Sequence, residues 1–386
     1  MRCSSSLSTR VSLSGPFLNS HPQTPERTPL DRSPGHLPRS LRACSSVPSS
    51  VHRWACGGTS SICGSGGSDL HAGTFGRSNW KIPCTVRVRL AHYRKFCREG
   101  NHTMFISGIA DEAGQDIATQ VKANKELGWS HIEVRNVNET NLTDVPDDGF
   151  DQILRAVTDA KLQISCFASR IANWAKDISD PSSFESDQEE LARAIPRMKK
   201  AGTPFIRIMS YANKQNMPDA EWRDQAVERI STLARMAEDG EITLLHENCD
   251  GWGGLGPAQT LELLAAVNSP ALRLVFDTGN TVPHCQDTMD YYQKVRRYID
   301  YVHIKDARKV GGSCTFCFVG DGDARVAEII TDLKNTGYNG GFSIEPHVAA
   351  IVHERKTATA EELYSSYIEY GRRLNKIVEG IMGSQG

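Results

Sequence analysis

The stretch ITLLHENCDGWGGLGPAQTLELLAAVNSPALRLVFD, residues 242–277, contains one complete repeat of the pattern that decides the fold. A short run of β-forming residues ends at Glu247, and a glycine-rich segment follows it. Pro257 then opens a stretch with helical spacing of apolar residues, and a second β-rich run ends at Asp277. A strand, a helix and a second strand joined this closely predict two parallel strands with the helix crossing between them.

The same alternation runs from Met104 to near the end of the chain. Strands are predicted at 104–109, 131–135, 162–168, 205–209, 242–247, 273–277, 301–305 and 341–345. Helices are predicted at 115–127, 150–160, 186–201, 220–238, 257–267, 289–298, 324–336 and 360–377. Asp187 and Pro257 mark helix starts, and Gly128, Gly202, Gly240 and Gly337 mark helix ends.

Eight strand–helix pairs match the (β/α)₈ TIM barrel, which typically takes about 250 residues as a single domain. Residues 104–386 are therefore predicted to form one α/β domain of this kind. A doubly wound open sheet is the alternative. Such a sheet usually has fewer strands, and no G-x-G-x-x-G motif follows the first predicted strand.

Residues 1–103 differ from the rest in composition. They hold 14 Lys and Arg against four acidic residues, whereas the remainder holds 30 against 42. Ser, Pro, Gly and Arg dominate, so this segment is expected to be a disordered extension that cannot bury enough apolar surface to fold. We favour a translation start at Met104. The alternatives are an organellar transit peptide and, less favoured, a secretory signal.

Composition also excludes several classes of protein. No run of 18 apolar residues exists, so no membrane span is expected. The acidic balance after Met104 argues against a nucleic-acid partner, whose footprint should be basic. Eleven cysteines are too dilute for a disulfide scaffold. The expected location is the cytoplasm, with an organelle as the alternative if residues 1–103 act as a transit peptide.

The last four predicted strands each carry, at or near their end, a residue that can bind a metal ion. These residues are Glu247, Asp277, His303 and Glu345. The carboxyl ends of barrel strands form one mouth, so the four side chains are expected to converge. Three carboxylates held together repel one another unless a cation neutralises them. Oxygen-rich ligation with one nitrogen suits Mn²⁺, Mg²⁺ or Co²⁺, and Zn²⁺ is also compatible with it.

These strand ends carry a family resemblance. The segments His246-Glu247-Asn248, Phe276-Asp277-Thr278-Gly279-Asn280, Val302-His303-Ile304-Lys305-Asp306 and Ser343-Ile344-Glu345-Pro346 resemble the xylose-isomerase-like TIM-barrel superfamily of sugar phosphate isomerases and epimerases. The loop at 319–323 and the segment at 337–340 are also typical of it. The resemblance implies that Glu247, Asp277, His303 and Glu345 bind the metal. In the ketose 3-epimerase branch, the glutamates that match Glu247 and Glu345 also form the acid/base pair.

That pairing suits the chemistry. Isomerising or epimerising a ketose removes a proton beside a carbonyl and returns it elsewhere, and a carboxylate on each side of the substrate can do both. The epimerase branch often has His three residues after the Asp ligand, whereas this chain has Asn280. An amide can hydrogen-bond a hydroxyl but cannot carry a proton at neutral pH. A metal-dependent dehydratase of a keto-cyclitol or related polyol therefore stays open, as does a barrel that binds a ligand without turning it over.

Other polar residues near the strand ends are candidates for binding a small sugar or polyol substrate. They are Glu133, Arg135, Arg170, Arg207, Asn280, Lys305 and His347. Glu133 and Arg135 alternate and so share one face of their strand, and an arginine can hold a phosphate or carboxylate with two hydrogen bonds. Trp252 is expected either to cover the sugar or to pack within its loop. The pair Cys314 and Cys317 is interpreted as incidental. The family resemblance further implies a homodimer.

Overall fold

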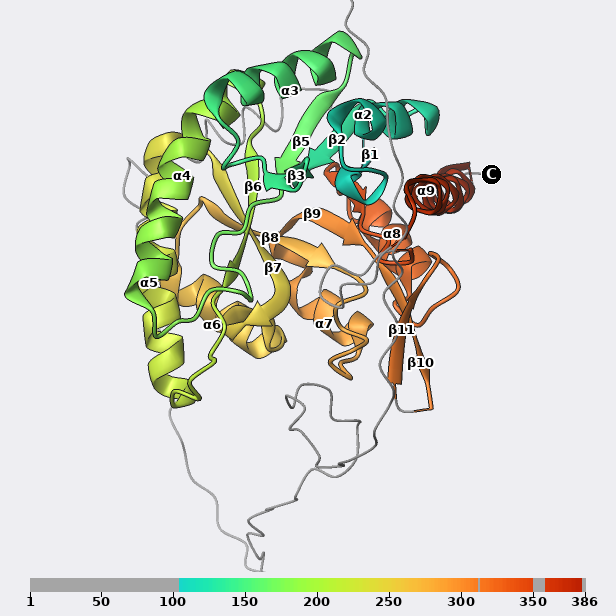
Figure 1. The fold of residues 1–386 in the computed structure, drawn as a ribbon. Helices are drawn as coiled ribbons and strands as arrows, with labels where there is room; N and C mark the ends of the chain where they lie inside the picture. The colour runs from blue at the N-terminus through green and yellow to red at the C-terminus, as the bar shows by residue number, and fades with distance from the viewer. Residues whose placement is uncertain (1–103, 312, 350–357, 384–386) are drawn as a thin grey trace, which may run out of the picture. The chain divides into compact units, whose positions relative to one another are not determined.

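Eight parallel strands form the centre of the fold in a computed structural model that describes residues 104–311, 313–349 and 358–383 (Figure 1). The strands are β1 (Phe105–Gly108), β2 (His131–Val134), β5 (Gln163–Phe167), β6 (Phe205–Ser210), β7 (Thr243–Gly251), β8 (Leu272–Asp277), β9 (Ile299–Ile304) and β12 (Gly341–Ile344). The predictions made for residues 1–103 lie outside the described residues.

The strands follow one another around a ring. Their order is β1-β12-β9-β8-β7-β6-β5-β2, and neighbouring strands in this order pair in parallel. A parallel bridge between Ile109 and Glu133 joins the end of β1 to β2 and nearly closes the ring. The predicted TIM barrel is confirmed.

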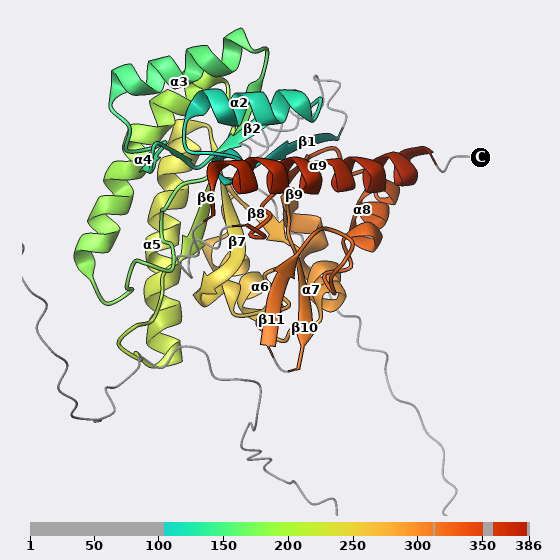
Figure 2. The ribbon, with the colours of Figure 1, turned by 45° about the vertical axis from the view of Figure 1, so that its right-hand side comes forward.

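Helices lie outside this ring and alternate with its strands (Figures 1 and 2). They are α2 (Ile117–Glu126), α3 (Asp147–Asp159), α4 (Pro181–Ala201), α5 (Asp219–Gly240), α6 (Pro257–Val267), α7 (Thr288–Val295), α8 (Val326–Asn335) and α9 (Ala360–Gly383). In α3 the buried residues are Phe150, Ile153 and Val157, a spacing that places one apolar stripe against the sheet.

The expected helix start at Asp187 is wrong. α4 begins at Pro181, because the Asp180 side chain accepts a hydrogen bond from the Ser182 backbone and caps the helix. Asp187 is instead buried within α4. Gly240 is the last residue of α5, and the left-handed residue that ends that helix is Glu241. A Cβ at Gly240 would lie 2.9 Å from the side chain of Ile195, so this glycine permits close packing of α5 on α4.

Large side chains fill the inside of the barrel, as is usual for this fold. A small core cluster of Cys166, Leu245, Val275 and Tyr301 lies apart from the larger core between sheet and helices. The Tyr301 hydroxyl lies 2.8 Å from the hydroxyls of Ser107 and Ser165. The interior is therefore a packed core and not an open channel.

Two short hairpins lie outside the ring and were not predicted. The first pairs β3 (Asn136–Val137) with β4 (Thr140–Asn141), and the second pairs β10 (Asp306–Val310) with β11 (Ser313–Cys317). The second hairpin directly follows β9 and extends away from the barrel strands (Figure 2). Among the described helices, none combines the length and the hydrophobicity that crossing a membrane requires.

Candidate metal centre

The four predicted ligands meet at the carboxyl ends of neighbouring strands. Glu247 lies on β7, Asp277 ends β8, His303 lies on β9 and Glu345 follows β12. Each offers a ligand atom, and these atoms all lie within 4.8 Å of one another. His303 Nδ1 is 3.0 Å from Glu247 Oε1 and 3.9 Å from Glu345 Oε2. All four side chains are buried.

Asp277 is oriented by the turn that follows it. Its Oδ1 accepts hydrogen bonds of 2.8 Å from the backbone amides of Gly279 and Asn280. The Asn248 side chain exchanges two hydrogen bonds with the Asp277 backbone. A Cβ at Gly279 would lie 2.7 Å from the Lys305 side chain, so the turn needs glycine there. Asp277 Oδ2 therefore faces the cluster, where Lys305 Nζ lies 3.0 Å from it.

Cationic side chains contact the carboxylates. Lys305 Nζ lies 3.0 Å from Asp277 Oδ2 and 2.7 Å from Glu345 Oε2. The Arg135 guanidinium lies 2.9 Å from Glu345 Oε1. Arg135, Lys305 and Asp277, which the sequence already singled out, therefore form one network with Glu345.

Both glutamates are ionised at neutral pH. Burial alone would raise the pKa of Glu247, but the positive charges of Arg207 and His303 outweigh it and hold that pKa at about 2. Burial acts in the same direction on Glu345. There the surrounding cations, Lys305 foremost, hold the pKa well below its ordinary value.

The pKa values of Asp277 and His303 are both raised, in contrast to those of the two glutamates. Burial raises the pKa of Asp277 to about 6, and Lys305 only partly opposes that rise. Burial disfavours the charged form of His303, but the carboxylates of Glu133 and Glu247 raise its pKa to about 10. Before a cation binds, His303 is therefore protonated at neutral pH.

The donor atoms fit a divalent metal ion. Glu247 Oε2, Asp277 Oδ2 and Glu345 Oε2 are buried and converge on one place. Arg207 lies 3.5 Å from the first of these oxygens, and Lys305 contacts the other two. Three buried carboxylates repel one another and need positive charge nearby, which a divalent ion can supply together with these side chains. Three carboxylates and one imidazole suit Mn²⁺, Mg²⁺, Co²⁺ or Zn²⁺.

A second group of metal-binding residue types shares Glu345 with the first. Glu112, in the 3₁₀ turn η1 (Ala110–Glu112), and His347 complete it. Glu112 Oε2 accepts a 2.8 Å hydrogen bond from the His347 backbone, and its Oε1 lies 3.2 Å from His347 Nδ1. Sequence reasoning missed Glu112, although it closely follows the first predicted strand. The Phe316 ring of β11 lies 5.2 Å from the His347 ring.

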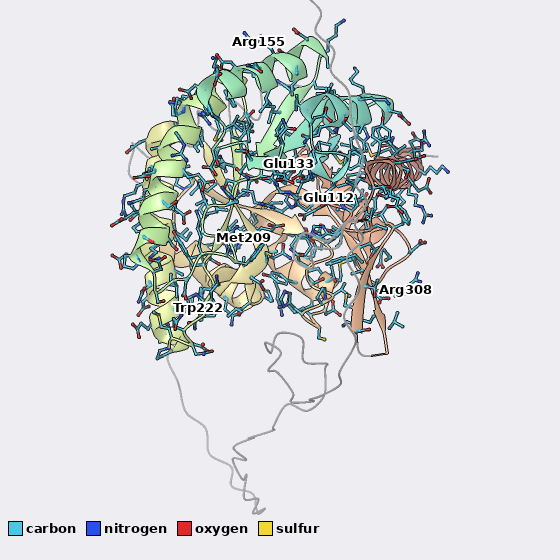
Figure 3. The ribbon with its side chains drawn as sticks, viewed as in Figure 1. Glu112, Glu133, Arg155, Met209, Trp222 and Arg308 are labelled. Atoms are coloured by element: carbon cyan, nitrogen blue, oxygen red, sulfur yellow. The ribbon has the colours of Figure 1, made fainter. Side chains whose placement is uncertain are left out.

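The remaining predicted substrate-binding residues divide into two sets. Glu133, Arg207, Asn280 and Lys305 all contact the cluster. Arg207 lies 3.5 Å from Glu247 Oε2, and Asn280 Oδ1 accepts a 3.2 Å hydrogen bond from Lys305. Figure 3 shows Glu112 and Glu133 toward the middle of the barrel. Arg170 does not join them, because its half-exposed side chain pairs with Asp144.

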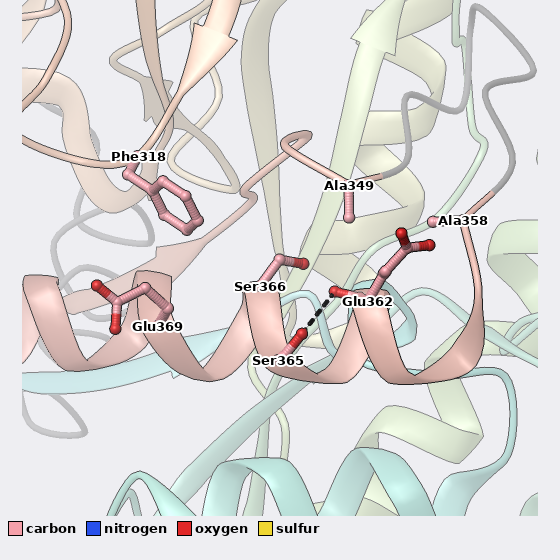
Figure 4. A pocket seen from close by; sticks show the side chains of 7 residues that line it. All are labelled: Phe318, Ala349, Ala358, Glu362, Ser365, Ser366 and Glu369. Atoms are coloured by element: carbon pink, nitrogen blue, oxygen red, sulfur yellow. Dashed lines mark hydrogen bonds between the residues drawn. The ribbon is translucent and has the colours of Figure 1, made fainter.

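The weaker sequence candidates lie elsewhere. Trp252 is buried in η2 (Trp252–Gly254), with its ring edge against Trp222 at 5.7 Å, which is a packing contact. Cys314 and Cys317 are free thiols of β11. A separate cavity of about 520 Å³ lies along α9 and contains none of the proposed ligands (Figure 4). Its lining residues are Phe318, Ala349, Ala358, Glu362, Ser365, Ser366 and Glu369.

Curated proteins resemble part of this chain. An inosose dehydratase of Bacillus thuringiensis (strain Al Hakam) is 25% identical over 156 residues, which cover 36% of this chain and 52% of the relative. A 2-epi-5-epi-valiolone 7-phosphate 2-epimerase of an Actinoplanes species is 29% identical over 174 residues, covering 45% and 61%. The chain spans about half the length of the first of these relatives.

Solved structures share the fold at low identity. A D-tagatose 3-epimerase-like protein superposes with a TM-score of 0.59 at 16% identity, covering 73% of this chain and 100% of the other. A xylose isomerase-like protein from Mycobacterium smegmatis in complex with magnesium gives 0.54 at 19% identity, covering 72% and 98%. The sequence profile described as xylose isomerase-like TIM barrel matches residues 121–367, more than half of the chain. The chain therefore belongs to the xylose isomerase-like TIM barrel family.

Proposed function

We propose that this chain is a metal-dependent enzyme that isomerises or epimerises a sugar, sugar phosphate or related polyol. It would do so by moving a proton on the carbon next to a carbonyl group. The observation that carries the proposal is the buried set of Glu247, Asp277, His303 and Glu345, whose ligand atoms lie within 4.8 Å of one another.

The proposed partner is a small molecule rather than nucleic acid or a membrane. The homodimer and the cytoplasmic location stay predictions.

Glu247 and Glu345 are the proposed acid/base pair. They come from β7 and the end of β12, with β8 and β9 between them, so they approach a bound substrate from different directions. Both have a depressed pKa and are ionised, so either can accept a proton from carbon. The glutamate that takes the proton can return it to the neighbouring carbon on the same face. Delivery to the other face needs a second proton, which the other glutamate would first have to take up from solvent.

Asp277 and His303 would mainly hold the ion, together with the two glutamates. A divalent ion there would polarise the carbonyl of the substrate and stabilise the negative charge that develops on its oxygen. Asn280, whose buried amide nitrogen has no hydrogen-bond acceptor among the described residues, can donate to a substrate hydroxyl.

A dehydratase of a keto-cyclitol or related polyol is the second candidate. Asn280 stands where the epimerase branch often carries histidine, and its amide does not carry a proton at neutral pH. The Lys305 ammonium lies 2.7 Å from Glu345, so a proton donor for a departing hydroxide stands beside a proposed base. The similarity to inosose dehydratases is in line with this alternative.

Solvent exchange tests both candidates. The purified chain, loaded with Mn²⁺, is incubated in D₂O with a panel of ketoses, aldoses, their phosphates and inososes, and the products are analysed by NMR and mass spectrometry. We expect deuterium at the carbon next to the carbonyl, and no exchange after chelation of the metal. An isomerase or epimerase product keeps the atoms of the substrate apart from exchanged hydrogen, whereas a dehydratase product has lost water. Absence of exchange across the panel, with metal bound, would count against the proposal.

A further inference from the structure

Glu133 reaches His303 across the inside of the barrel. Glu133 lies on β2 and His303 on β9, and β12 and β1 separate those strands in the ring. Even so, Glu133 Oε1 lies 3.2 Å from His303 Nε2. Both side chains have zero exposed surface. The sequence makes Glu133 a candidate for contacting substrate, and in the structure its Oε1 faces the His303 ring.

The two ring nitrogens of His303 face different groups. Nδ1 lies 3.0 Å from Glu247 Oε1 and 3.9 Å from Glu345 Oε2, so it points toward the other proposed ligands. Nε2 points away from them, toward Glu133. Nδ1 is thus the nitrogen that can bind a metal ion.

A histidine that binds a metal through Nδ1 carries its remaining proton on Nε2. That N–H needs an acceptor when it is buried, and the acceptor fixes both the tautomer and the orientation of the ring. Glu133 Oε1 supplies it. The ring also lies edge-on to Tyr301, with the two centroids 6.0 Å apart, so packing assists the hydrogen bond in limiting rotation.

We propose that Glu133 is a positioning residue of the metal centre. It accepts a hydrogen bond from His303 Nε2, holds Nδ1 toward Glu247, Asp277 and Glu345, and places a further negative charge behind the ligand. This inference rests on the proposed function in that His303 is taken as a metal ligand. It adds Glu133 of β2 to the strands that carry the proposed ligands.

Metal titration tests the inference without a substrate. Mn²⁺ and Co²⁺ are titrated into the metal-free full chain and its Glu133→Gln and Glu133→Leu variants by calorimetry, and the visible spectrum of bound Co²⁺ is recorded. Glu190→Gln is the matched control, because Glu190 is also a buried carboxylate but contacts Thr143 and Lys176. Thermal unfolding of each metal-free variant shows whether it folds.

We expect Glu133→Leu to weaken metal binding by about 10- to 100-fold and to change the Co²⁺ spectrum, because the ring loses its acceptor. Glu133→Gln should fall between this variant and the unaltered chain, since its amide oxygen still accepts the hydrogen bond but carries no charge. Glu190→Gln should match the unaltered chain. If Glu133→Leu does not fold, the graded effect of Glu133→Gln and its spectrum decide the question.

Unchanged affinity and spectrum in the folded Glu133 variants would overturn the proposal. An equal loss in Glu190→Gln would also overturn it, because the effect would then be a general one. If the unaltered chain binds neither ion, the metal centre and the role of Glu133 fail together. If metal binding depends on Glu133 but no panel substrate exchanges deuterium, the positioning role stands and the proposed function fails.

Discussion

Glu247 and Glu345 differ in the positive groups that keep them ionised. Arg207 lies 3.5 Å from Glu247 Oε2, whereas Lys305 and Arg135 contact one oxygen each of Glu345. Each proposed base therefore contacts cations of its own, although His303 Nδ1 lies 3.0 Å from Glu247 and 3.9 Å from Glu345. This separation makes single substitutions informative.

Removing either carboxylate should abolish most of the activity. Glu247→Gln and Glu345→Gln keep the volume of the side chain and one acceptor oxygen but cannot take a proton from carbon. We expect each to lower the rate of deuterium incorporation by about 10²- to 10⁴-fold, the usual contribution of general acid–base catalysis. Glu190→Gln is the control, and full exchange activity in either active-site variant would contradict the assignment.

Metal binding should release a proton from His303. The pKa of about 10 means that the imidazole is doubly protonated at about pH 8 before the ion binds. An ion that takes the Nδ1 lone pair displaces that proton, so affinity should rise with pH, by about tenfold per unit between roughly pH 7 and pH 9. Above the pKa the dependence should vanish. Calorimetry in buffers of different ionisation enthalpy counts the protons, and a count of zero at about pH 8 would refute the expectation.

The proposed ligands were accessible to sequence analysis because strand ends are local features. Glu247, Asp277, His303 and Glu345 each close, or nearly close, a β-rich run, and barrel topology brings such ends together. Glu133 illustrates what that reasoning lacks. Its position on a strand was predicted, but its contact with His303 depends on distances across the barrel interior that no local pattern encodes.

Among the elements, the eight barrel strands and their helices follow from apolar periodicity, and their observed limits differ by a few residues. The hairpin of β10 and β11 does not follow from it. Arg308, Lys309 and Val310 at its outer end are exposed, and β11 packs only Cys314 and Phe316 against the large core. Pairing within the hairpin, from Asp306 with Cys317 to Val310 with Ser313, stabilises it instead.

The contact between α9 and the end of α2 depends on a small residue. A Cβ at Gly371 would lie 2.4 Å from Leu127 Cδ1, whereas a Cβ at Gly380 of the same helix would meet no atom within 4 Å. We expect Gly371→Ala to lower the free energy of unfolding by about 1–3 kcal/mol through overpacking. Gly380→Ala should raise it by up to about 1 kcal/mol, because alanine favours the helix.

Chemical denaturation of both variants measures this difference. A Gly371→Ala chain as stable as Gly380→Ala would show that α9 does not pack tightly at this point. Metal affinity should be unchanged in both variants, since neither glycine contacts the cluster.

For the whole molecule, metal binding should stabilise the fold. The carboxylates repel one another, and an ion that binds only the folded state adds about 2.7 kcal/mol at a concentration of 100 times its Kd. For a domain of this size the Tm should rise by roughly 5 to 10 °C. Thermal unfolding with Mn²⁺ and with a chelator tests this, and Asp277→Asn should lose most of the rise. A Tm that does not respond to any of the four ions would contradict the metal centre.

The near-closure of the ring has a consequence for biosynthesis. Phe105 of β1 pairs with Gly341 of β12. The first barrel strand to leave the ribosome therefore has no pairing partner on this side until the last strand has been synthesised. Until then the nascent chain exposes unpaired edges on β1 and on the newest strand, and such edges invite pairing with other chains. The mouth of the barrel, which includes Glu345 at the end of β12, can therefore assemble only after β12 has been synthesised.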